Sequence, residues 1–232
     1  MKILEFFKWK FIDIYRFFKT RKYRPIHLYG IYGYLGLPGY GKTMAMSQEL
    51  ISLREKYGDK IYIFTNYGFK EEDKPFLKWQ QLLEEYDKPA VFAWDEVQNE
   101  FNSRDYTNFP VELLTLLTQN RKGNGKRIYY TAQRYNRVDK VFRELSFLVG
   151  ECRTIMGRYT RVRFYDTEDY EMLLGTTDVN RRIKIKPRKR VSFVQTDDIR
   201  NSYDSYQMLD SAKKKSYIDK GDIKIEEVRR IL

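Results

Sequence analysis

Eight consecutive residues near the start of the chain have the types and spacing that bind nucleotide phosphates. The stretch matches the loop pattern G-x-x-x-x-G-K-[ST] without a mismatch and consists of Gly36, Leu37, Pro38, Gly39, Tyr40, Gly41, Lys42 and Thr43. Glycines let backbone N–H groups wrap around a β-phosphate, and Lys42 brings positive charge to the β- and γ-phosphates. The Thr43 hydroxyl is a group of the kind that ligates Mg²⁺. The octet therefore predicts a nucleotide-binding site.

An acidic pair, Asp95 and Glu96, directly follows the apolar run 90–94. Asp95 at the end of a strand can hold Mg²⁺ near Thr43, and Glu96 can orient or deprotonate an attacking water. Gln133 ends another apolar run and can touch the γ-phosphate or that water if the two strands are neighbours. Lys42, Glu96 and Gln133 are therefore the predicted catalytic residues, and Thr43 and Asp95 the predicted metal ligands. Two adjacent carboxylates favour hydrolysis over binding alone.

The surrounding sequence alternates strand-like and helix-like segments. Strands are predicted at 27–35, 60–66, 90–94, 127–133, 146–157 and 158–166, and helices at 44–56 and 110–119, with a loop and a short helix at 73–86. The last two strands are expected to meet at a hairpin turn at Gly157 and Arg158. Such alternation predicts a mostly parallel sheet flanked by helices, with ligands at the carboxyl ends of the strands. The predicted fold class is α/β, a P-loop NTPase core of the ASCE (RecA-like) type.

The sequence divides into an N-terminal amphipathic helix (1–24), the P-loop core (25–166) and a basic C-terminal extension (167–232). Charged residues recur at helical spacing in the first part and exclude a signal-peptide core. They leave a wide aromatic face that can lie in a membrane interface, pack on its own domain, or pack on a neighbouring subunit. Because no apolar run approaches the ~20 residues of a membrane span, no transmembrane segment is expected.

Composition points to a polyanionic partner. The 232 residues include 44 Lys and Arg against 32 Asp and Glu, which gives a net charge of +12, and such a charge favours nucleic acid or an anionic membrane surface. With one histidine, His27, and one cysteine, Cys152, a Cys/His zinc site is excluded. Catalysis by a Ser-His or Cys-His pair is excluded too, unless His27 serves. We expect Cys152 to be a small strand residue and His27 to be structural.

A run of basic residues lies in the C-terminal extension. Its members are Arg181, Arg182, Lys184, Lys186, Arg188, Lys189 and Arg190. As an extended segment, the run can track a nucleic-acid backbone. It can equally be a solvated basic strand, or an arm that lies against an acidic surface of another subunit.

Three segments together resemble the zonular occludens toxin (Zot)-like ATPases, which include the filamentous-phage assembly ATPases and sit near the FtsK/HerA DNA-translocase group. The segments are GLPGYGKT, AVFAWDEVQNEFNSRDY and QNRKGNGKRIYYTAQRYNRVDKVFREL, and the resemblance covers about residues 28–165. It implies an ATPase that uses ATP and Mg²⁺, forms a homo-oligomeric ring (hexamer or pentamer) and contacts DNA and virion, coat or portal proteins. It also implies an arginine supplied by the next subunit, with Arg121, Arg104 and Arg143 as candidates in falling order.

Three functions follow as hypotheses. The first is an ATP-driven motor of phage or mobile-element type for DNA packaging, translocation or virion assembly and export. The second is a nucleotide-dependent assembly scaffold at a membrane or virion. The third, a GTPase or small-molecule kinase, lacks the N-K-x-D motif, to which 136–139 is only a near miss. The chain has no hydrophobic segment beyond the core, unlike many relatives, which favours a packaging or translocation motor in the host cytoplasm, on the virion, or peripheral to the inner membrane face.

Overall fold

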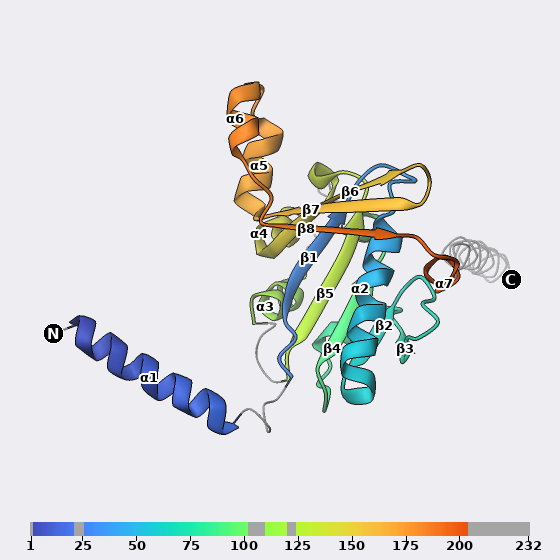
Figure 1. Cartoon of the computed structure of the whole chain (residues 1–232). Coiled ribbons are helices and arrows are strands. Elements are labelled where there is room, and N and C mark those ends of the chain that lie inside the picture. The colour runs from blue at the N-terminus through green and yellow to red at the C-terminus, as the bar shows by residue number, and fades with distance from the viewer. Residues whose placement is uncertain (1, 21–25, 102–109, 120–123, 204–232) are drawn as a thin grey trace, which may run out of the picture.

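The computed structural model describes residues 2–20, 26–101, 110–119 and 124–203 (Figure 1). Within them, eight strands form one mixed sheet in the order β3-β2-β4-β5-β1-β6-β7-β8. The strands are β1 (Gly30–Leu35), β2 (Tyr62–Thr65), β3 (Lys74–Pro75), β4 (Ala90–Trp94), β5 (Lys126–Ala132), β6 (Ser146–Ile155), β7 (Tyr159–Tyr165) and β8 (Lys189–Val194).

Six neighbouring strands, from β3 to β6, run parallel, and β7 and β8 continue the sheet antiparallel. β5 lies between β1, which leads into the phosphate-binding loop, and β4, which ends at the acidic pair. The residues that follow these three strands therefore meet at one edge of the sheet.

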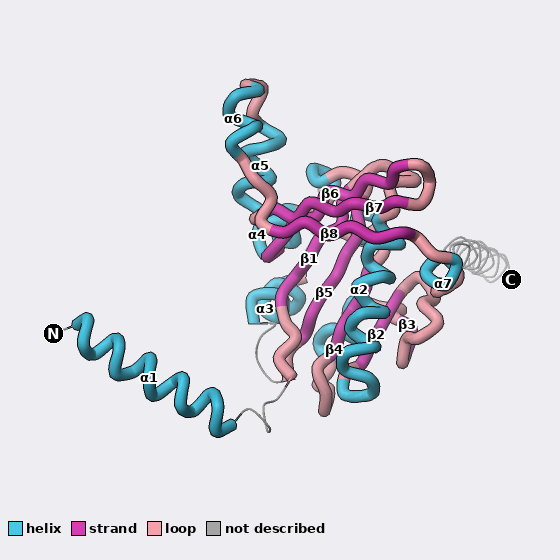
Figure 2. Tube along the Cα trace, viewed as in Figure 1, coloured by secondary structure: helices cyan, strands magenta, loops and turns pink. Residues whose placement is uncertain are grey.

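Helices cover both faces of the sheet (Figure 2). α2 (Lys42–Tyr57) packs Met46 and Leu50 into one buried cluster, whereas α3 (Val111–Gln119), α4 (Lys140–Leu145) and α5 (Thr167–Gly175) pack on the opposite face. α6 (Val179–Lys184) and α7 (Asp197–Arg200) flank β8 in the chain. Single 3-10 turns occupy Gly58–Lys60, Trp79–Leu83, Val97–Asn99 and Tyr135–Arg137.

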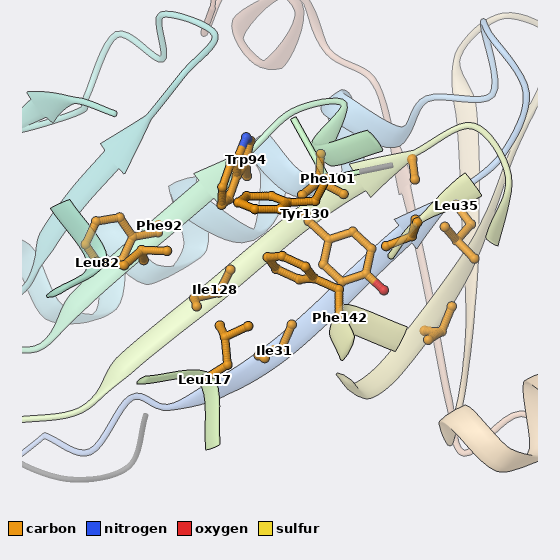
Figure 3. Close-up of a cluster of buried hydrophobic side chains, with 14 of the residues drawn as sticks. Ile31, Leu35, Leu82, Phe92, Trp94, Phe101, Leu117, Ile128, Tyr130 and Phe142 are labelled. Carbon is orange, nitrogen blue, oxygen red and sulfur yellow. The ribbon is translucent and has the colours of Figure 1, made fainter. Parts of the chain in front are cut away.

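The central strands carry the core because both of their faces are covered. All five residues of β4 are buried; Trp94 of β4 and Tyr130 of β5 pack against Phe142 of α4, and Phe92 lies beside Leu82 (Figure 3). This packing fixes the direction of the strand ends and hence the positions of the polar residues that follow them.

One local expectation is wrong. The basic run is not one extended segment, because residues 179–184 form α6 and β8 begins only at Lys189, after the break at Pro187. The hairpin between β6 and β7 is confirmed: its turn occupies 156–158, and both Met156 and Gly157 have positive φ. β8 pairs with β7, so the chain on both sides of residue 166 contributes to one sheet.

The N-terminal helix α1 (Lys2–Thr20) stands away from the sheet (Figure 1). From Lys2 to Lys19 only Ile12 is partly buried, so the helix does not pack on its own domain here. Among the described residues, no helix has the length and apolarity needed to cross a membrane.

Candidate functional site

The phosphate-binding loop joins β1 to the amino end of α2. Gly39 and Gly41 have φ of 80° and 79°, a left-handed conformation that favours glycine. Lys42 is only 8% exposed, and its Nζ donates a hydrogen bond to the Leu37 carbonyl at 3.3 Å. The loop is thus folded around its lysine at the N-terminus of a 16-residue helix, where backbone N–H groups and the helix dipole attract anions.

The antiparallel strands β6, β7 and β8 support the phosphate-binding loop. A Cβ atom at Gly41 would lie 2.5 Å from the Thr154 hydroxyl, so only glycine fits against β6 at this point. That hydroxyl lies 2.9 Å from the Thr160 hydroxyl on β7, which accepts a 2.8 Å hydrogen bond from the buried Gln195 amide after β8. Strands β6, β7 and β8 therefore position the phosphate-binding loop as well as extending the sheet.

Asp95 lies against the start of α2, as the sequence predicts. The hydroxyls of Thr43 and Thr131 both donate to its Oδ1, at 3.0 Å and 2.5 Å. Its backbone is held by Asn66, whose Oδ1 accepts from the Asp95 N–H at 2.7 Å and whose Nδ2 donates to the Asp95 carbonyl at 3.1 Å. One carboxylate is thus fixed by residues from α2, β5 and the end of β2.

The donor set fits Mg²⁺. Burial raises the pKa of Asp95 above its ordinary range, while the hydrogen bonds from Thr131 and Thr43 act in the opposite direction. A buried carboxylate beside a threonine hydroxyl is a hard oxygen pair, and Mg²⁺ is usually held by one or two carboxylates together with substrate phosphates and water. Among the described residues, no cluster of three or more acidic, cysteine or histidine side chains offers an all-protein metal cage.

Glu96 adopts a left-handed backbone with φ of 53°, rare for a non-glycine residue. Its N–H donates to the Thr131 hydroxyl at 2.9 Å, so Thr131 links the backbone of Glu96 to the carboxylate of Asp95. The Glu96 carboxylate accepts hydrogen bonds from Gln133 Nε2 at 3.3 Å and Asn99 Nδ2 at 3.1 Å. The strained backbone and two amide donors orient a carboxylate that is suited to act on water.

Three residues of this network have no predicted role in the sequence analysis: Asn66, Asn99 and Thr131. The sequence pattern could have indicated two of them. Asn66 directly follows strand β2. Thr131 is two residues before Gln133, and because side chains alternate along a strand, Thr131 and Gln133 lie on one side of β5. Asn99 sits in a short 3-10 turn whose course the sequence does not predict.

Of the three candidate arginines, the structure describes only Arg143. Arg121 and Arg104 lie outside the described residues, so their predicted roles stay predictions. Arg143 lies on α4, 3.5 Å from the Glu171 carboxylate and with its guanidinium 5.1 Å from the centre of the Tyr135 ring. In this conformation it is held within its own chain.

The structure separates the members of the basic run. Arg182 and Lys184 are exposed on α6, and Arg181 lies on the same helix. Lys186 is exposed before β8, and Arg190 is exposed on it. Arg188 pairs with Asp166 at 2.5 Å, and Lys189 lies over the Phe164 ring. The run therefore does not form a single track.

Neither His27 nor Cys152 is placed to do chemistry. His27 is exposed and precedes the amino end of β1, whereas the phosphate-binding loop follows the carboxyl end. Cys152 is buried, and burial raises the pKa of its thiol to about 12, so the thiol stays protonated and unreactive at neutral pH.

Comparison of structures gives the N-terminal domain of zonular occludens toxin from Neisseria meningitidis, with a TM-score of 0.50 and 16% identity over 76% of this chain and 100% of that domain. The chain shares the fold of that toxin domain. The Zot-like resemblance and the P-loop NTPase fold predicted from the motifs are thus confirmed as to fold. A weaker likeness, with a TM-score of 0.46 and 12% identity over 60% of this chain and 93% of the other, is to the genome packaging NTPase B204 from Sulfolobus turreted icosahedral virus 2 in complex with ATP-gammaS.

By sequence, no protein-family model matches the chain and no curated protein matches it significantly.

Proposed function

We propose that the chain hydrolyses ATP and uses the energy as a motor of phage or mobile-element type, for DNA packaging, translocation or virion assembly and export. The observation that carries the proposal is the convergence of Thr43, Asp95, Glu96 and Gln133 at one strand edge beside Lys42. A site for binding alone needs the loop and Asp95. Glu96, oriented by two amides next to the loop, is what hydrolysis requires in addition.

The chain's own groups divide the work. The loop N–H groups and Lys42, which is only 8% exposed, stabilise the negative charge of the phosphates, because fixed dipoles and a buried charge act more strongly than the same groups in water. Glu96 orients a water and accepts its proton, and Gln133 keeps the Glu96 carboxylate aligned through the 3.3 Å hydrogen bond. Thr43 and Asp95 would hold Mg²⁺, which would neutralise phosphate charge when bound.

The test is the ATPase rate of the full chain as wild type, Glu96→Gln and Glu144→Gln. Glu96→Gln keeps the shape but removes the base, so we expect hydrolysis to fall by about 10²–10⁴-fold while binding of an ATP analogue persists. Glu144→Gln, which removes an exposed carboxylate paired with Lys140 at 3.4 Å, is the control. Unchanged hydrolysis in Glu96→Gln would disprove the mechanism.

A ring completes the proposal. We infer that a neighbouring subunit supplies the arginine that stabilises transition-state charge, with Arg121 as the first candidate; such arginines are worth about 10³–10⁵ in rate. The net charge of +12 supports DNA as the polymer that is moved.

The exposed N-terminal helix favours a second role, attachment to a membrane, which suits the alternative of an assembly scaffold. Ten large apolar side chains of α1 are each 43–77% exposed. Five basic residues against two acidic ones give the helix a positive charge. A wide aromatic face with basic flanks suits the interface of an anionic bilayer, whereas a helix–helix seam is narrower. We propose that α1 binds anionic lipid.

Sedimentation with vesicles tests this role. The full chain should bind phosphatidylglycerol-containing vesicles and bind pure phosphatidylcholine vesicles more weakly, because lipid charge contributes to binding. Replacing Phe7, Phe11 and Phe18, which share one side of the helix, with alanine should abolish binding; Trp9→Ala, on the opposite side, is the control. Retained binding in the triple variant, or a dimer through α1 without vesicle binding, would contradict the proposal.

A further inference from the structure

A cavity of about 700 Å³ opens beside the phosphate-binding loop, on the sheet face away from α2. Gly36, Leu37 and Tyr40 of the loop form one wall, and the segment after β5 forms another, starting at Gln133. The charged residues of the lining are five arginines and one glutamate: Arg134, Arg137, Arg153, Arg161, Arg163 and Glu151. The cavity is therefore strongly positive.

The arginines are not neutralised within the described part of the chain, where none of the five forms an ion pair or a side-chain hydrogen bond. Arg161 and Arg163 are half-buried, so their charge is partly removed from water. Half-buried charges without partners are costly, and an anion that enters the cavity would relieve that cost.

The pairing of the strands places two pairs of like charges on this face. Arg153 on β6 is directly opposite Arg161 on β7. Arg163 on β7 is directly opposite Arg190 on β8 on one side and Glu151 on β6 on the other. Directly opposed residues of antiparallel strands share a face, and like charges in that position destabilise a sheet. Figure 2 shows these three strands side by side at the edge of the sheet. A sheet that carries two such pairs on one face breaks a local rule, which is typical of functional sites.

We propose that this arginine cavity binds a nucleic-acid strand by its phosphates, an inference that rests on the proposed function and assigns it a contact site. Arginine guanidinium groups match phosphate in geometry and charge. Tyr40, 38% exposed at the rim, adds an aromatic surface of the kind on which unpaired bases stack. These features favour a nucleic-acid strand over an acidic protein segment.

The site is connected to the hydrolytic centre in two ways. Gln133 lines the cavity and donates to Glu96, so a strand bound beside it lies next to a residue that orients the base. Strands β6 and β7 carry the arginines on one face and, on the other, the threonines that support Gly41. We therefore expect nucleic acid to change the rate of hydrolysis through this cavity.

Fluorescence anisotropy with labelled single-stranded and double-stranded oligonucleotides tests the assignment on the full chain. Arg161→Gln/Arg163→Gln should weaken binding of the single strand by at least about tenfold, since hydrogen bonds to charged groups are strong. The salt slope of binding should fall by about 0.7 for each lost phosphate contact. Lys184→Gln/Lys186→Gln, which removes two charges from the basic run, is the matched control.

Each of the following outcomes would overturn the inference, and they differ in what they say about the proposed function. Equal affinity of wild type and the arginine variant, loss in the lysine variant alone, or preference for an acidic peptide overturns the inference but not the proposed ATPase. Loss of ATP-analogue binding in the arginine variant would instead place the cavity within the nucleotide site and also overturn it. A wild type that hydrolyses ATP but binds no nucleic acid removes DNA from the proposed function as well. If the double variant does not fold, the exposed Arg153→Gln replaces it.

Discussion

Two regions beside the phosphate-binding loop contrast in how their charges are satisfied. At the carboxyl ends of β4 and β5, the Asp95 and Glu96 carboxylates each have two hydrogen-bond donors from side chains of the same chain. On the arginine face of β6 and β7, Arg153 is opposed to Arg161 and neither has such a partner among the described residues. The two carboxylates of the first region are paired within the chain, whereas the second region has an excess of positive charge that a bound anion would offset.

This contrast shows how two tasks can share one sheet. Catalysis needs groups fixed before the substrate arrives, because electrostatic stabilisation costs no reorganisation when the donors are already in place. Binding a polyanion is favoured by positive charges that repel one another when the site is empty, because the bound phosphates offset that repulsion. Gly41 joins the regions, since the phosphate-binding loop lies against Thr154 of the second.

Thr131→Val should break the first region and have the largest effect. The change removes one hydroxyl that both donates to Asp95 and accepts from Glu96, while the shape is nearly kept. Both carboxylates lose alignment, and we expect kcat to fall by about 10²-fold, as a small misplacement of catalytic groups does. Thr118→Val, which removes an exposed hydroxyl on α3, is the control in the same ATPase assay. A rate within about twofold of wild type would show that the network is dispensable.

Gly41→Ala should separate the two regions and have the next largest effect. Its matched control is Gly39→Ala, because both glycines have φ near 80° but a Cβ at Gly39 has no neighbour within 4 Å. Each change carries the left-handed cost of about 1–2 kcal/mol. Gly41→Ala adds the collision with Thr154 and should weaken ATP-analogue binding by a further tenfold or more. Equal affinities by calorimetry would mean that β6 does not support the loop.

The sequence predicts the first region well and the second poorly, for physical reasons. Local sequence patterns contain Lys42, Thr43, Asp95 and Glu96. The parallel pairing of β1, β5 and β4 then brings the carboxyl ends of these strands to one edge of the sheet. The arginine face depends on which residues of three strands stand opposite one another, and register is a tertiary property. Arg153, Arg161 and Arg163 look like ordinary exposed strand residues until β6 and β7 are paired. The basic run 181–190 is conspicuous in the sequence, yet α6 and β8 divide it.

Arg153→Glu sharpens the contrast with the smallest effect, and it moves stability and binding in opposite directions. Glutamate at this position faces Arg161, so a repulsive cross-strand pair becomes an attractive one, worth about 0.2–1 kcal/mol in the free energy of unfolding. Urea unfolding at low salt should show a higher midpoint, and the gain should shrink at high salt because exposed charges are screened. Arg153→Lys keeps the charge and should show no gain. Nucleic-acid affinity should fall in Arg153→Glu alone. If the variant is less stable than wild type at low salt, the opposed arginines do not destabilise the fold by repulsion. The excess positive charge of this face is then not what favours anion binding.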